Sequence, residues 1–269
     1  IKRLLDILDE NNIKFRLAAP TGRAAKRMFE GTGKNAETLH RLLEFTPANM
    51  GFARNQQNAL DLNVLIVDEA SMIDVFLMSS IMKALPDKAQ LVLIGDIDQL
   101  PSVGAGNVLH DLITSEKVAT VRLTEIFRQA KDSMIVVNAH RMNNGEFPLS
   151  TQENAQDDFR YVKELIAENI FPLLRKIYTK VLPARGISPD DAVVLCPMNK
   201  GIVGTQRINQ VLQSILNPTS NPDQELSRFG QTYKVRDRVM QIRNNYDKFV
   251  FNGDMGHITA IDREEQQFK

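Results

Sequence analysis

Two adjacent carboxylates, Asp68 and Glu69, are the residues of this sequence best suited to chemistry. They follow the apolar, β-branched run 64–67, which has the length and composition of a strand buried on both faces of a parallel sheet. Ligands bind at the carboxyl ends of such strands. There Asp68 could hold Mg²⁺ through water, and Glu69 could orient or deprotonate a water that attacks a γ-phosphate. A bare apolar–Asp–Glu sequence is as often a solvated strand end, so its context must decide.

Two further side chains that suit phosphoryl transfer follow later apolar runs. Gln99 comes shortly after the run 91–94, and its amide could sense a γ-phosphate or the attacking water. Arg128 follows the stretch that begins at Leu123, and an arginine that reaches a triphosphate stabilises the charge that spreads during phosphoryl transfer. A lone glutamine more often faces solvent and an arginine more often forms a surface salt bridge, so both interpretations of each residue stay open.

The apolar residues that surround these side chains alternate between helical and strand-like patterns. Helical spacing occurs in four early segments, 1–8, 38–45, 75–85 and 107–114. Strand-like runs stand at 13–19, 64–67, 91–94 and 193–196. This alternation predicts an open, doubly wound α/β sheet.

A polar stretch, residues 150–158, reads as a linker near a domain boundary. Beyond it, helical spacing predicts a long helix over 162–177, which Pro172 should kink or divide, and another helix over 208–215. Alternating apolar residues on both sides of Asn252-Gly253 predict a β-hairpin, since Asn-Gly readily supplies the positive φ angles of a tight turn.

The charge of the chain is informative only locally. Its 269 residues hold 33 basic and 33 acidic side chains, so net charge gives no argument for nucleic-acid binding. Basic residues exceed acidic ones in two sets, which are Lys14, Arg16, Arg23, Lys26, Arg27 and Lys34, and then Lys234, Arg236, Arg238, Arg243 and Lys248. Either set could equally be an ordinary solvated face.

Composition excludes several classes of protein. No apolar run is long enough to span a bilayer and no signal-peptide pattern begins the sequence, so we expect a cytoplasmic protein with no membrane partner. The single cysteine, Cys196, excludes a disulfide framework and a cysteine-based zinc site. The four histidines are scattered, which leaves no set of ligands for a structural metal.

Five ordered motifs resemble one known family. They are AAPTGRAA at 18–25, TLHRLL at 38–43, LIVDEAS at 65–71, GDIDQLPSVGAGNVL at 95–109 and LTEIFRQ at 123–129. Together they resemble the superfamily-one helicases, above all the RecD-like helicases that include the exodeoxyribonuclease V alpha subunit. Further matches at 197–205 and 245–256 extend the resemblance over essentially the whole chain.

The resemblance implies an α/β fold of the P-loop NTPase class. Two RecA-like parallel-sheet domains would stand in tandem, followed by the start of a small SH3-like β insertion. The domain boundaries expected on this basis are 1–150 for the first RecA-like domain, 151–248 for part of the second, and 249–269 for the start of the insertion.

Roles for single residues follow from the resemblance as well. Asp68 would hold the Mg²⁺ of bound ATP, Glu69 would be the catalytic base, Gln99 would couple nucleotide state to DNA, and Arg128 would be the arginine finger that reaches the nucleotide. Contacts with single-stranded DNA are implied for Pro20, Thr21, Arg23, Thr38, His40, Pro101, Val103 and Asn252.

The implied activity is ATP-driven movement along single-stranded DNA, with separation of duplex junctions, in recombination and repair. The protein would work alone or with RecB- and RecC-like subunits. Two alternatives stay open. An RNA helicase is one, because Asp68-Glu69-Ala70-Ser71 is loosely similar to the D-E-A-D form. A non-catalytic chain that binds DNA or a partner is the other.

One element of the family pattern is not found in the sequence. A working ATPase of this class needs G-x-x-x-x-G-K-[ST], and none of the 269 residues forms it. Gly31-Thr32-Gly33-Lys34 is a decoy, because Asn35 follows the lysine and Met28 occupies the first glycine position. We expect the helix at Ile1 to be the one that follows the phosphate loop. The loop and the last motif of the family would then lie outside this sequence, and the chain alone would be inactive.

Overall fold

The computed structural model describes most of the chain in two compact units. The described residues are 1–46, 51–123, 133–149, 158–218, 221–228, 230–243, 245, 248, 250 and 252–269. One unit comprises Ile1–Ile126 with Ile242–Asp254, and the other comprises Phe127–Gln241 with Met255–Lys269. Among the described residues, no helix has the length and apolar character needed to cross a bilayer.

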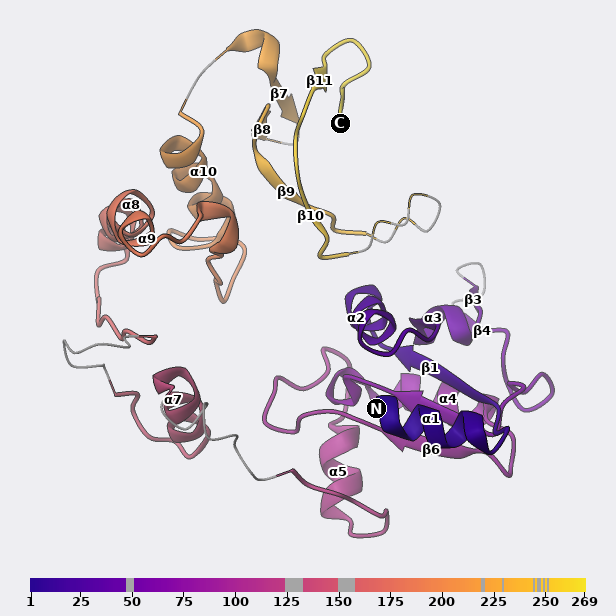
Figure 1. Ribbon diagram of the computed structural model, residues 1–269. Coiled ribbons are helices and arrows are strands. Elements are labelled where there is room, and N and C mark those ends of the chain that lie inside the picture. The colour runs from indigo at the N-terminus through magenta and orange to yellow at the C-terminus, as the bar shows by residue number, and fades with distance from the viewer. Residues whose placement is uncertain are drawn as a thin grey trace. The chain divides into compact units, whose positions relative to one another are not determined.

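A parallel sheet forms the centre of the first unit (Figure 1). Its described strands run in the order β2-β1-β5-β6, with bounds Ala36–Thr38 for β2, Phe15–Ala19 for β1, Val64–Val67 for β5 and Gln90–Leu93 for β6. Leu17 pairs with Ile66, and Ile66 pairs with Val92. The sheet confirms the predicted α/β class and the three early strands that the apolar runs predicted.

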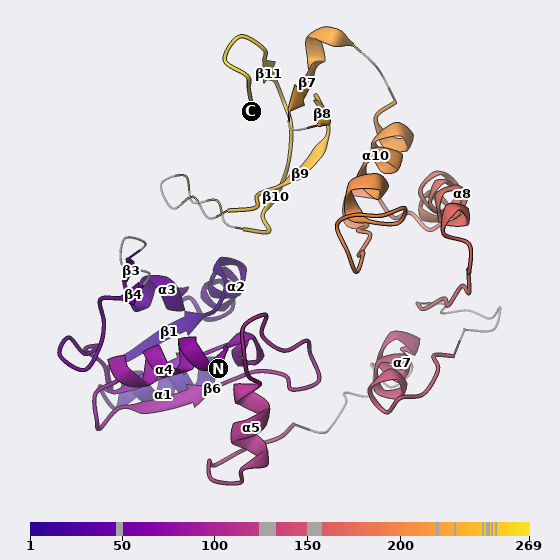
Figure 2. The ribbon, with the colours of Figure 1, turned by 180° about the vertical axis from the view of Figure 1, so that it is seen from behind.

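Helices cover both faces of this sheet. They are α1 (Lys2–Glu10), α2 (Gly22–Thr32), α3 (Leu39–Leu42), α4 (Val75–Ala84) and α5 (Val108–Thr114). Every residue of β5 is buried, and successive side chains point to opposite faces. Ile66 packs with Leu5 of α1, whereas Leu65 packs with Leu39 of α3 and Ile81 of α4. Helix α1 lies in front of the sheet in Figure 1, and α4 lies in front in Figure 2, so the sheet is doubly wound as predicted.

A short hairpin follows α3. Strands β3 (Phe45–Thr46) and β4 (Gly51–Phe52) pair antiparallel, so the helical pattern predicted over 38–45 is confirmed only to Leu42. Glu44 has a φ of 55°, a left-handed conformation that an α-helix does not accept, and the chain turns there.

The second unit begins with helices. Their bounds are α7 (Met134–Asn143), α8 (Ile170–Lys176), α9 (Leu182–Ala184) and α10 (Thr205–Leu216), with the 3₁₀ turns η2 (Ala167–Asn169), η4 (Pro189–Asp191) and η5 (Pro222–Gln224) and the π-helical turn η3 (Ile177–Val181). The Ser133 hydroxyl, which precedes α7, donates to Asp158 at 2.6 Å and holds the pKa of that carboxyl below its usual value. The core beyond α7 is formed by Leu174, Tyr178 and Ile208.

Antiparallel pairs of short strands complete the second unit. They are β7 (Glu225–Arg228) with β8 (Gln231–Lys234), β9 (Arg238–Met240) with β10 (Met255–His257), and β11 (Ile261–Asp262) with β12 (Gln267–Phe268). Gly253 has the positive φ of 94° expected of the Asn-Gly turn. However, β10 pairs with β9, so the segment that joins the two strands of this hairpin spans 241–254 and is longer than the predicted tight turn.

Two predictions for the second half of the chain need correction. The helix predicted over 162–177 begins only at Ile170, which places Pro172 in the first turn of α8, where proline fits best. Residues 193–196 form no strand, because no described segment pairs with them. Val194 and Cys196 pack on the core, while Val193 and Leu195 are exposed, so the run has only one buried face.

Candidate nucleotide and DNA site

The carboxyl ends of three neighbouring strands meet at one edge of the first unit's sheet. The backbone N–H of Asp68 donates to the carbonyl of Ala18 at 3.0 Å, and that of Ala70 donates to the carbonyl of Ile94 at 2.9 Å. Asp68 and Glu69 therefore lie between the segment that follows β1 and the segment that follows β6. These are the segments that carry Pro20 and Gln99.

Glu69 has an unusual backbone conformation. Its φ of 54° and ψ of 39° are left-handed, which costs a residue with a Cβ about 1–2 kcal/mol. Backbone strain of this kind clusters at functional sites. The Glu69 N–H donates to Asp68 Oδ1 at 2.9 Å, and both residues are half-buried. Within the described part of the chain neither carboxylate forms an ion pair, so both can face a ligand.

A buried hydroxyl and a close glycine support this turn. Ser71 Oγ is buried and has no hydrogen-bond partner among the described residues. A Cβ placed on Gly95 would lie 3.1 Å from the backbone nitrogens of Ala70 and Ser71, so only glycine fits there easily. Sequence reasoning missed the roles of Ser71 and Gly95, although Gly95 directly follows an apolar run.

The polar groups of this turn are of the kinds that bind a nucleotide with its Mg²⁺. Mg²⁺ usually takes one or two protein carboxylates and completes its shell with water and phosphate oxygens. Asp68 would supply the carboxylate, and the unpartnered Ser71 hydroxyl could donate to an oxygen nearby. The phosphate-cradling part of such a site is not among the 269 residues.

The other two residues predicted for nucleotide chemistry are less defined. Gln99 is exposed on a turn in which its N–H donates to the Asp96 carbonyl at 3.3 Å. Among the described residues, no hydrogen bond joins its side chain to Asp68 or Glu69. Arg128 lies outside the described residues. The roles predicted for both remain predictions.

Two threonines predicted to contact DNA stand at the ends of neighbouring strands and cap helices. Ala19 of β1 pairs with Thr38 of β2, which brings the segment after each strand together. Thr21 Oγ1 accepts from the N–H of Ala24 at the start of α2, and Thr38 Oγ1 accepts from the N–H of Arg41 at the start of α3, both at 3.2 Å. Each hydroxyl therefore has a structural role whether or not DNA binds.

Replacing Thr21 separates these roles. Thr21→Ala should lower the free energy of unfolding by about 1 kcal/mol, because the first turn of α2 loses its cap. Urea denaturation without DNA measures this change. Thr21→Ser, which keeps the hydroxyl, should stay close to the parent value. Equal stability of the alanine and serine variants would show that the cap contributes little.

Helix α2 presents an exposed row of cations. Arg23, Lys26 and Arg27 are spaced three and four residues apart on one helical face, and none is paired within the described part of the chain. In contrast, Lys14 pairs with Asp61 and Lys34 pairs with Asp9. Arg16 is likewise paired, with Glu37. The first basic set therefore divides into a neutralised half and an unpaired half, and the unpaired half includes Arg23.

Of the remaining residues predicted to bind DNA, Pro20 is half-buried and the others lie on exposed surface. His40 packs against Phe45 and Phe52, with ring centroids 5.6 Å apart in each pair. Pro101 and Val103 are exposed in the loop after β6. Asn252 belongs to the segment grouped with the first unit, and a Cβ on its neighbour Gly253 would lie 3.8 Å from Arg23 Cδ.

The structure also explains the decoy glycine pair. Gly33 is the C-cap of α2, with a φ of 71°, and its N–H donates to the Phe29 carbonyl at 2.7 Å. Lys34 pairs with Asp9 at 2.6 Å. Gly31-Thr32-Gly33-Lys34 therefore ends a helix and does not precede one, which is the reverse of a phosphate loop.

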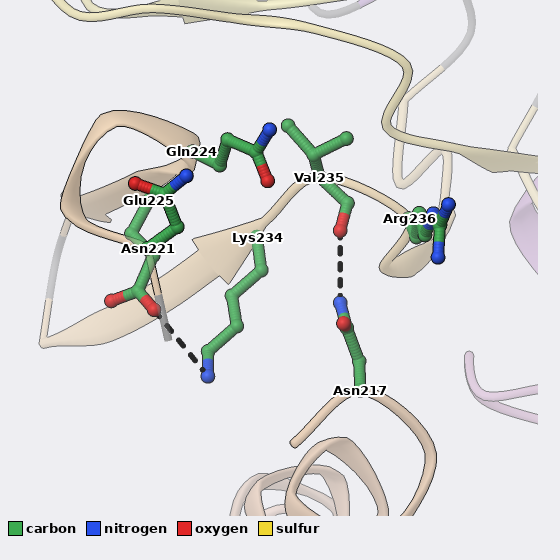
Figure 3. Close-up of a pocket in the computed structure, with 7 residues that line it drawn as sticks. All are labelled: Asn217, Asn221, Gln224, Glu225, Lys234, Val235 and Arg236. Carbon is green, nitrogen blue, oxygen red and sulfur yellow. Dashed lines mark hydrogen bonds and ion pairs between the residues drawn. The ribbon is translucent and has the colours of Figure 1, made fainter. Parts of the chain in front are cut away.

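A polar pocket of about 320 Å³ lies in the second unit (Figure 3). It is lined by Asn217, Asn221, Gln224, Glu225, Lys234, Val235 and Arg236. Lys234 Nζ lies 3.5 Å from Glu225 Oε1, and Asn217 Nδ2 donates to the Val235 carbonyl at 2.9 Å. The first contact joins β8 to β7, and the second joins the end of α10 to the residue after β8. The lining includes none of the residues predicted for chemistry or DNA binding.

Family comparisons match both parts of the chain. A model described as an AAA domain matches residues 1–164. A model described as the SH3 domain of ATP-dependent RecD-like DNA helicases matches residues 208–269.

Curated relatives match nearly all of this chain but only part of their own length. An ATP-dependent RecD2 DNA helicase from Deinococcus radiodurans is 36% identical over 259 residues, which cover 96% of this chain and 34% of that protein. A RecBCD enzyme subunit RecD from Mycobacterium tuberculosis is 29% identical over 288 residues, which cover 95% of this chain and 48% of that protein. The chain thus spans between a third and a half of the length of these two relatives.

Solved helicase structures are similar at lower identity. Pif1 from Bacteroides bound to single-stranded DNA has 18% identity and a TM-score of 0.49, and the match covers 96% of this chain and 62% of that chain. Pif1 helicase from Candida albicans has 24% identity and a TM-score of 0.47, with 98% and 62% covered.

The first family match covers more than half of the chain, over the sheet that carries Asp68 and Glu69. The second family match covers residues 208–269, and its description names the RecD-like DNA helicases. This chain therefore belongs to the AAA domain family, and over nearly its whole length it is similar to the RecD-like helicases.

Proposed function

We propose that this chain is the motor part of an ATP-dependent DNA helicase that moves along single-stranded DNA. The observation that carries the proposal is the turn at Asp68 and Glu69. There two carboxylates, which no described residue neutralises, stand at the carboxyl edge of a parallel sheet on a strained backbone. The relatives named as DNA helicases support it. Duplex junctions would be its substrates, in recombination and repair.

Each residue of this site has a different role in hydrolysis. A bound Mg²⁺ would neutralise charge on the phosphates. Asp68 would hold that ion, and Glu69 would accept the proton of the attacking water. Gln99 reports the state of the nucleotide to the loop that follows it, and Arg128 stabilises the charge that develops on the phosphates.

Single-stranded DNA would run along the surface that carries Pro20, Arg23, His40 and Val103. The exposed cations of α2 support this path, because phosphates attract cations, and no carboxylate of the described residues neutralises these. Asn252 would join the path from the segment beside Arg23. We propose the same DNA-facing role for Thr21, Thr38 and Pro101.

The partners and domain limits belong to the proposal as well. RecB- and RecC-like subunits are candidate partners, because several relatives are named as RecBCD enzyme subunits, whereas the RecD2 relative is named as a helicase with no such complex in its name. We propose that the first RecA-like domain ends near residue 150 and that the β insertion begins near residue 248. The SH3 family match begins earlier, at residue 208.

Binding of single-stranded DNA tests the DNA path in this chain alone. Fluorescence anisotropy with a labelled oligonucleotide should show weak binding that is independent of sequence and falls as salt rises, because phosphate contacts release counterions. Arg23→Ala should weaken binding to every sequence and lower the slope of log K against log salt by about 0.7–1.

Lys14→Ala is the matched control, since Lys14 is exposed but already paired with Asp61. It should leave both the affinity and the salt slope unchanged. Binding that ignores salt, or an equal loss in the two variants, would count against the path along α2. Tighter binding to an RNA oligonucleotide of the same sequence would favour the RNA helicase alternative.

A further inference from the structure

The loop after β6 is fastened to the beginning of α4. The N–H of Val75 donates to the carbonyl of Ala105 at 3.0 Å. Asp74 caps α4 by accepting from the N–H of Leu77 at 2.7 Å. A Cβ placed on Gly104 would lie 2.7 Å from Asp74 Cγ and 2.8 Å from Asp74 Cβ, so the loop backbone touches the cap without space for a side chain.

The same loop is held in shape from within and is apolar on its outside. The Ser102 hydroxyl lies 3.0 Å from the carbonyl of Gly104 and 3.1 Å from that of Gly106. Leu100 is 88% exposed and Val103 is fully exposed. The loop is therefore a defined piece of surface, packed on α4 by its glycines.

The turn that carries the carboxylates reaches this loop at two places. Gly95 packs on the backbone of Ala70 and Ser71 at the start of the loop segment. Four residues after Ala70, Asp74 packs on Gly104 near the end of that segment. The short 3₁₀ turn η1 (Ala70–Met72) lies between these contacts. A displacement of the turn would therefore move both ends of the loop.

We propose that Asp74 and Gly104 form a close-packed joint that transmits the state of the nucleotide at Asp68 and Glu69 to the exposed loop, and from there to single-stranded DNA. The proposal rests on the proposed function. Close packing favours such transmission, because packed contacts switch between discrete arrangements and do not deform smoothly. Asp74 and Gly104 are positioning residues, because they reach DNA and nucleotide only through their neighbours.

The test uses this chain joined to a phosphate loop and to the last family motif, and it measures ATP hydrolysis with and without single-stranded DNA. Gly104→Ala should keep basal hydrolysis close to the parent rate and should lower the stimulation by saturating DNA about tenfold. A loop that merely binds DNA poorly would show the opposite split. Its KM for DNA would rise, and saturating DNA would restore full stimulation.

Two variants test the contact itself. In Asp74→Gly with Gly104→Ala, the Cβ moves to the other side of the joint, and stimulation should return to within about threefold of the parent, since coupled contacts are not additive. Gly31→Ala is the matched glycine control, because a Cβ there meets nothing within 4 Å. It should behave like the parent.

The outcomes separate the two proposals. If the parent protein shows no DNA-stimulated hydrolysis, the proposed function fails. If the parent is stimulated and Gly104→Ala is stimulated equally, the joint is refuted. Should Gly104→Ala not fold, Asp74→Gly alone removes the side chain on which Gly104 packs, and full stimulation in that variant refutes the joint as well.

Discussion

Purified residues 1–269 should hydrolyse no ATP above background, even with saturating single-stranded DNA. Asp68 and Glu69 can position an ion and a water, but no backbone amides or lysine of a phosphate loop hold the triphosphate. Its negative charges would instead face Asp68, Glu69, Asp96 and Asp98 with little compensation. A phosphate-release assay checks the result.

Joining a phosphate loop to the chain, together with the part of the second domain that carries the last family motif, should bring back hydrolysis that DNA stimulates. Both sides of the nucleotide site would then be present. The decisive contrary result would be DNA-stimulated hydrolysis by residues 1–269 that Glu69→Gln abolishes. That pair of observations would show that the phosphate loop is dispensable here.

Glu69→Gln in the phosphate-loop-bearing protein should lower kcat by about 10²–10⁴-fold and leave ATP binding intact. The neutral amide can still hydrogen-bond a water but cannot accept its proton. Stopped-flow binding of a fluorescent nucleotide and steady-state hydrolysis measure the two effects separately. Glu10→Gln on the exposed face of α1 is the control and should match the parent.

A different combination of effects on nucleotide binding and on turnover would show that Glu69 is not the catalytic base. Loss of nucleotide binding with unchanged turnover per bound ATP would make it a binding residue. Equal turnover in Glu69→Gln and the parent would leave the carboxylate without a part in hydrolysis.

Sequence reasoning found the elements whose residues carry their own signal. The run 64–67 is apolar at every position, as a strand buried on both faces must be, and β5 lies where that run predicted. The same logic failed at 193–196, because a strand also needs a neighbour with free backbone groups and composition does not report one. Helix α3 ended early because Glu44 adopts a left-handed backbone, which no apolar spacing records.

The candidate site was only partly readable for a related reason. The adjacency of Asp68 and Glu69 is visible in the sequence, as is the position of Pro20 and Gln99 shortly after strand-like runs. That β1 and β6 flank β5 is known only from the fold. The contact of Gly95 with Ser71, and that of Gly104 with Asp74, join residues 24 and 30 positions apart. Distances of that kind come from packing, which one sequence without its fold does not specify.

The left-handed backbone at Glu69 sets folding and chemistry against each other at one residue. Glycine or asparagine would adopt a φ of 54° with less steric cost. Neither has a carboxylate that could accept a proton from water. Selection for stability alone would therefore favour glycine or asparagine at position 69. A glutamate there lowers the stability of the fold but holds an acid–base group in a fixed direction.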